Sequence, residues 1–258
     1  MYHRVPPPPP RTVSLSHTTT TASYMLLGEP RLAAGMQEVG FDVNVLQASG
    51  NLEVLPGYLY YPTRSDRPSP PATAVTGSYV SSTTRHAFHE DLSGTTDQFY
   101  VAPVLFYKLS SAGQGNGLVT VRTSWKSSGR MLGTRDVVVN PNNSTDDVMY
   151  FPVTGWVPAL GADKVMASIV ATDVNNAYVR TQLGVRTATD PAQPSTVSTL
   201  EGAFDNPGSG NDSRNTGELS LSLSTTNFFQ LVLMVKKNAG GDDNSRAIFR
   251  VSSALITS

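Results

Sequence analysis

The chain has 258 residues and a formal net charge of −1, and only 15% of its residues are charged. A chain with this charge balance has no excess of basic residues to attract a phosphate backbone, which argues against direct binding of nucleic acid. Cysteine is absent, so disulfides, thiolate metal sites and a cysteine nucleophile are excluded.

The N-terminus is polar and contains five consecutive prolines between two arginines. It lacks the apolar core of a signal peptide, and no stretch of the chain approaches the ~18 apolar residues of a membrane helix. We therefore expect a protein made in the cytoplasm that does not contact a membrane.

A proline run favours a stiff polyproline II rod, so residues 1–23 are expected to form an extended arm. We interpret the proline-rich part of this arm as a contact with a neighbouring subunit. Its candidate residues are Pro6, Pro7, Pro8, Pro9, Pro10 and Arg11. Arg4, Pro7 and Pro10 also fit the loose pattern of SH3-type ligands, which any proline run between arginines satisfies.

Residues 22–40 contain the only segment with the pattern of a short helix. Pro30 could occupy a first helical position, Leu32, Met36 and Val39 have helical spacing, and Gly40 would end the helix. Gly35 interrupts the pattern, because glycine disfavours a helix interior.

Beyond residue 40, apolar and polar residues alternate with a period of two, which is typical of strands. Four segments combine two alternating runs with a turn rich in Gly, Asn, Asp or Ser, and we interpret each as a β-hairpin. These segments are residues 41–60, 99–126, 165–187 and 227–255. Their starts recur about every sixty residues, which indicates an internal repeat.

The loops between these segments are long and rich in Pro, Asn, Asp, Ser and Gly, as in Greek-key folds. The sequence thus predicts an all-β protein, an antiparallel β-sandwich of jelly-roll-like type with at most one short helix. Two arrangements stay open. The chain could form two tandem sandwich halves, residues 24–140 and 141–258, or one continuous sandwich over residues 24–258.

His86 and His89, which precede Glu90 and Asp91, have a spacing that a metal site could use. Residues three apart on a strand point to opposite faces, however, so we predict no metal site there. Oxygen-rich turns at residues 146–147, 173–175 and 242–244 match no known calcium loop, and whether they bind calcium stays open.

The glycine-rich residues 113–117 precede a strand, whereas a dinucleotide site needs a helix N-terminus, so no cofactor is expected. No catalytic constellation stands out. The sequence predicts a non-enzymatic structural subunit of a symmetric assembly, a virion protein of the phage capsid, decoration or tail-like kind. Its partners would be copies of itself and other subunits of the particle.

The alternative is a β-sandwich module that binds a carbohydrate or a receptor. Aromatic side chains that share a strand face can stack on sugar rings, and they serve equally well as core residues. The candidate glycan platform consists of Tyr58, Tyr60 and Trp125.

Overall fold

The computed structural model is all-β and contains four antiparallel sheets. It describes residues 9–61, 72–81, 83–93, 98–139, 148–161, 163–175, 179–192, 197–205, 213–221, 228–237 and 246–257, and none of these residues lies in a helix. The chain divides into two compact units, Met1–Ser128 and Gly129–Ser258.

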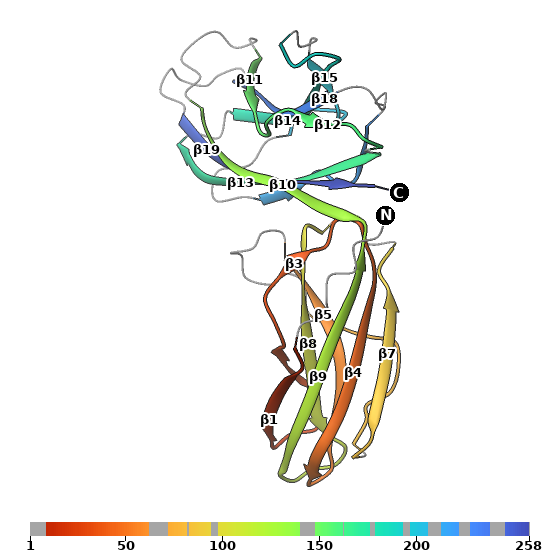
Figure 1. The fold of residues 1–258 in the computed structure, drawn as a ribbon. Coiled ribbons are helices and arrows are strands. Elements are labelled where there is room, and N and C mark those ends of the chain that lie inside the picture. The colour runs from red at the N-terminus through yellow and green to blue at the C-terminus, as the bar shows by residue number, and fades with distance from the viewer. Residues whose placement is uncertain are drawn as a thin grey trace. The chain divides into compact units, whose positions relative to one another are not determined.

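The first unit is built from two sheets (Figure 1). Sheet A has the strand order β1-β9-β4-β7, and sheet B has the order β2-β8-β5-β6, with β3 also paired to β8. The strands are β1 (Arg11–His17), β2 (Ser23–Leu26), β3 (Arg31–Leu32), β4 (Met36–Ser49), β5 (Leu52–Tyr61), β6 (Thr73–Ala74), β7 (Arg85–Asp91), β8 (Tyr100–Leu109) and β9 (Gly115–Ser127).

The second unit also has two sheets. Sheet C has the order β10-β19-β13-β16, with β17 on β13, and sheet D has the order β11-β18-β14-β15, with β12 on β18. The strands are β10 (Gly129–Val139), β11 (Met149–Pro152), β12 (Val157–Pro158), β13 (Lys164–Asn175), β14 (Val179–Ala188), β15 (Val197–Thr199), β16 (Ser213–Asn215), β17 (Leu219–Ser220), β18 (Phe228–Lys237) and β19 (Arg246–Ile256).

The two units have the same topology. In each, the first strand pairs with the last, so β1 lies beside β9 and β10 lies beside β19. The central pairs also correspond, with β4-β9 and β5-β8 in the first unit matching β13-β19 and β14-β18 in the second. Two sheets whose main paths of four strands are connected in this order form a jelly roll, which confirms the predicted fold class.

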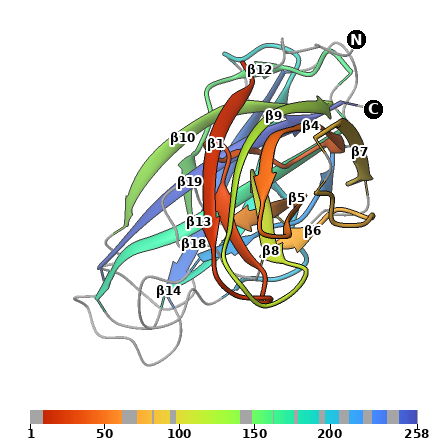
Figure 2. The ribbon, with the colours of Figure 1, turned by 90° about the horizontal axis from the view of Figure 1, so that it is seen from below.

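The four predicted hairpins are wrong as hairpins. Each consists of two consecutive strands that lie in different sheets: β4 and β5, β8 and β9, β13 and β14, and β18 and β19. We call such a pair a β-arch. In Figure 2, β9 and β4 can be followed side by side, as their pairing requires. A hairpin and an arch share alternating strands and a turn of Gly, Asn and Asp, so the pattern alone does not separate them.

The predicted helix in residues 22–40 is also wrong. The segment contains β2, β3 and the start of β4, and a turn at residues 34–35 separates β3 from β4. Gly35 adopts a φ of 69°, a left-handed conformation that glycine tolerates and that ends a helix. Met36 and Val39, which had helical spacing, are both buried in a strand.

The N-terminal segment and the unit boundary also differ in detail from the expectation. Residues 11–17 are strand β1, and Val13 and Leu15 of that strand are buried in the core. The two units divide at Ser128, whereas the Asn- and Asp-rich loop pointed to residues 140–147. Strand β10 pairs with β19 over its length and so belongs to the second unit.

Each unit has its own hydrophobic core between its two sheets. Phe41, Val43 and Val119 from sheet A pack with Val101 and Leu105 from sheet B. The corresponding strands of the second unit supply a separate cluster that includes Phe229, Leu231, Leu183, Phe249 and Val251. Alternation places these side chains on the inward faces.

Candidate functional site

The first unit contains a cavity of about 410 Å³, a volume typical of small-ligand sites. One wall comes from sheet A and the residues just before it, and the other from β8 and the segment that joins β2 to β3. We call this space the Trp125 cavity. Its lining residues are Pro9, Arg11, Leu27, Gly28, Glu29, Pro30, Arg31, Pro103, Val121, Thr123 and Trp125.

Strand β9 places three of these side chains by alternation. Val121, Thr123 and Trp125 are two residues apart and share the face that points between the sheets. The ring of Trp125 packs against the edge of the hydrophobic core. Its Nε1 atom is buried and has no hydrogen-bond partner among the described residues. A buried N–H without an acceptor is costly.

Arg11 connects the two walls of the Trp125 cavity. It is the first residue of β1 in sheet A, and its Nη1 donates a hydrogen bond of 3.1 Å to the carbonyl oxygen of Leu26 in β2 of sheet B. Arg31 and Glu29 add one positive and one negative group to the same cavity. The lining therefore combines an indole and three proline rings with a few charged donors and acceptors.

The structure places the predicted interaction residues in different parts of the first unit or leaves them undescribed. Arg11, Pro9 and Trp125 come together at the Trp125 cavity, and Pro10 is exposed beside them. Pro6, Pro7 and Pro8 lie outside the described residues. The charged cavity residues that sequence reasoning missed are Glu29 and Arg31, whose segment was interpreted as a helix.

Tyr58 and Tyr60 are in a different place from Trp125. Both are core residues, 7% and 9% exposed, and their rings meet edge to face with centroids 5.4 Å apart. Burial, with smaller contributions from Tyr60 and Glu90, raises the pKa of Tyr58 to about 12. A sugar can stack only on an accessible ring face, so these two residues do not form the predicted exposed platform with Trp125.

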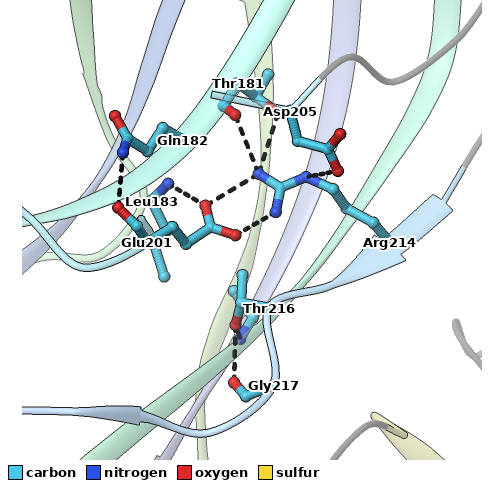
Figure 3. Close-up of polar contacts among 9 residues, drawn as sticks. Thr181, Gln182, Leu183, Glu201, Asp205, Arg214, Thr216 and Gly217 are labelled. Atoms are coloured by element: carbon cyan, nitrogen blue, oxygen red, sulfur yellow. Dashed lines mark hydrogen bonds and ion pairs between the residues drawn. The ribbon is translucent and has the colours of Figure 1, made fainter. Parts of the chain in front are cut away.

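The second unit has a polar cluster centred on Arg214 of β16 (Figure 3). Its guanidinium forms an ion pair with Glu201, donates to the backbone oxygen and hydroxyl of Thr181 at 3.3 and 3.2 Å, and lies 3.6 Å from Asp205. Glu201 in turn accepts a hydrogen bond from the backbone N–H of Leu183. The cluster thus links β16 of sheet C to β14 of sheet D.

The remaining candidates do not converge. His86 is half-buried and His89 is exposed, on opposite faces of β7, and Nδ1 of His89 lies 3.1 Å from Oε1 of Glu38. The acidic turns at residues 146–147 and 242–244 lie outside the described residues. Within the described ranges, no group of three or more His, Asp or Glu side chains is placed to hold a metal ion. No helix long and apolar enough to cross a membrane occurs in that part of the chain either.

Comparison with known proteins found no matching family model and no matching curated protein. Among solved structures, one of the infectious bursal disease virus Gt strain is 10% identical with a TM-score of 0.36, over 100% of this chain and 73% of that chain. The PBSX exported protein XepA is 9% identical with a TM-score of 0.27, over 95% and 86% of the two chains.

A tandem of carbohydrate-binding modules, CBM22-1 and CBM22-2 of Paenibacillus barcinonensis Xyn10C, is 10% identical with a TM-score of 0.28, over 94% of this chain and 97% of that chain. Likenesses this distant go no further than a β-sandwich architecture, and no functional argument rests on them.

Proposed function

We propose that the protein is a non-enzymatic structural subunit of a symmetric assembly, namely a virion particle. The observation that supports this most directly is a pair of apolar edge strands. Strand β2 ends sheet B and exposes Tyr24 and Leu26, which are 42% and 44% exposed. Strand β11 ends sheet D at the equivalent position and exposes Tyr150, which is 45% exposed.

Edge strands that carry exposed apolar side chains are sites where another chain can pair or pack. The two units present the same kind of edge because they share one topology, so each copy would offer two similar contacts. Repeated contacts of this type are what a closed symmetric assembly requires. The low charge content of the chain is compatible with burial of these surfaces.

Mass photometry tests the proposal. The 27.6 kDa chain should form one discrete oligomer. The double variant Tyr24→Ser with Leu26→Ser should shift the population towards the monomer, because it removes exposed apolar area from the β2 edge. Leu46→Ser is the matched control, since Leu46 is 48% exposed but lies in β4, inside sheet A. A monomer at every concentration would overturn the proposal.

Binding of a glycan is the second candidate, and the Trp125 cavity favours it, because it holds an indole ring beside charged side chains. A glycan array with the native protein and Trp125→Ala tests this. Specific signal that disappears in the variant would support a carbohydrate-binding module. An array without signal would leave the structural subunit as the better-supported function.

A further inference from the structure

We propose that the Trp125 cavity is the docking site for the N-terminal proline segment of a second copy of this chain. The inference rests on the proposed function and names the contact that would join the subunits. It assigns a function to two features of the chain: a cavity lined by an indole ring, and a proline run that begins before the first strand.

The first argument is the hydrogen-bonding character of the two surfaces. Proline has no N–H, so the five residues 6–10 present carbonyl acceptors and no backbone donors. Trp125 and Arg31 line the Trp125 cavity, and the guanidinium of Arg31 carries N–H donors and no acceptor. Proline-rich segments in the polyproline II conformation dock in grooves lined by aromatic side chains, where their fixed shape lowers the entropic cost of binding.

The second argument is apolar shape and charge. Pro30 and Pro103 line the cavity with Trp125, and together they offer rigid apolar surfaces to proline rings. Among the described lining residues, Glu29 carries the only carboxylate, and Arg4 is the only Lys or Arg before the proline run. Arg4 of a bound proline rod could pair with this carboxylate.

The third argument is reach. A polyproline II segment rises about 3.1 Å per residue, so residues 4–8 span roughly 15 Å, enough to cross a cavity of this volume. Pro9 already lines the cavity of its own chain. Exchange of proline segments between neighbouring copies would close a ring, as a symmetric assembly requires.

A binding experiment tests the docking directly. A fluorescein-labelled peptide of residues 1–10 is titrated into the protein lacking residues 1–8, and anisotropy is recorded. We expect saturable binding that weakens in Trp125→Phe, because the smaller ring removes part of the aromatic surface on which the proline rings would pack. Binding should also weaken when the peptide carries Arg4→Ala or when the protein carries Glu29→Gln.

Trp156→Phe is the matched control, because Trp156 is the second tryptophan of the chain and lies in the other unit. It should bind the peptide like the parent protein. Unchanged near-ultraviolet circular dichroism from tyrosine confirms that each variant is folded. Equal affinity for Trp125→Phe and the parent would overturn the assignment of the cavity.

Mass photometry of the intact chain separates the remaining outcomes. Loss of the oligomer in both the truncated protein and Trp125→Phe supports docking between copies. An oligomer that persists in both overturns this inference and leaves the proposed function standing. A monomeric intact chain whose truncated form still binds the peptide means that the segment docks in its own cavity, which overturns both docking between copies and the assembly.

Discussion

Burial decides what an arginine–carboxylate pair contributes to this protein. Arg214 and Glu201 form their pair with side chains that are only 16% and 11% exposed. Arg250 and Asp136 form a two-bond pair of similar geometry, 2.9 and 3.1 Å long, with both side chains 51% exposed. The hydrogen bonds from Arg250 hold the pKa of Asp136 below its usual range. Solvent screens this exposed pair far more than the buried one.

Arg214→Met should therefore lower the free energy of unfolding by about 3 kcal/mol, because it leaves the buried carboxylate of Glu201 without its partner. Arg250→Met removes the same kind of group from the exposed pair and should lower the free energy of unfolding much less. Urea unfolding of the second unit measures both values. Equal losses in the two variants would contradict the role assigned to burial.

Tyr58 makes stability depend on pH at the alkaline end. Its pKa is about 12 in the folded protein and 10.0 in an unperturbed chain, so the folded state favours the protonated phenol. Between these pH values the unfolded chain loses the proton first, and the free energy of unfolding falls as pH rises from 10 to 12. Below pH 10 this contribution is constant.

Tyr58→Phe should make that alkaline fall smaller, because phenylalanine has no proton to lose. Urea midpoints between pH 8 and pH 12 provide the measurement, with roughly one-unit steps. Tyr150→Phe is the control, since Tyr150 is 45% exposed. A fall that is the same in Tyr58→Phe and in the parent protein would show that another group titrates in this range.

At the scale of elements, the β-arches meet each other at their turns. Gly50, in the turn between β4 and β5, has a φ of 64° and lies against the turn that precedes β9. A Cβ atom at Gly50 would overlap the carbonyl oxygen of Gln114 and lie 2.8 Å from the Cα atom of Gly115. Backbone atoms cannot move aside as a flexible side chain can, so the two arches fix each other's position.

Gly50→Ala should destabilise the first unit by more than about 3 kcal/mol, from the left-handed φ and the overlap together. Gly113→Ala is the control. Gly113 also has a positive φ, 151°, but nothing lies within 4 Å of a Cβ there, so only about 1–2 kcal/mol of backbone strain is expected. Thermal unfolding of both variants tests the contact between the arches, and equal losses would rule it out.

The arches also show which features of the fold the sequence pattern predicts and which it does not. Alternation located the eight strands β4, β5, β8, β9, β13, β14, β18 and β19. It did not show which strands pair, because pairing is a contact between residues far apart in the chain. Apparent repeats of about sixty residues were arches, two of which make one jelly roll.

The candidate site was predictable only in part, for a similar reason. Trp125 and Arg11 were named from residue type, one as an aromatic platform and the other as part of an arm. Their proximity depends on the hydrogen-bonded pairing of β1 with β9, which sequence patterns do not show. Tyr58 and Tyr60 had the same aromatic signal as Trp125, and only the position of β5 inside the sandwich distinguishes them.

At the scale of the whole molecule, two jelly rolls follow each other with one residue, Ser128, between β9 and β10. A connection of one residue has no linker-like composition. The longer Asn- and Asp-rich loop inside the second unit does have it, which is why the sequence predicted the domain boundary there. Each unit nevertheless has all eight strand positions of its own topology and a separate hydrophobic cluster. Units of about this size fold independently when their cores are self-contained.

We therefore expect Gly129–Ser258, produced alone, to fold. Strand β10 is required, because it covers the edge of β19 along ten residue pairs and buries Val137 and Val139 in the core. A fragment that starts at residue 141, after the Asn-rich loop begins, should lack this strand and aggregate through the uncovered edge of β19. Dispersed amide NMR signals and cooperative unfolding for the first fragment alone would place the boundary at Ser128, whereas two equally folded fragments would show that β10 is dispensable.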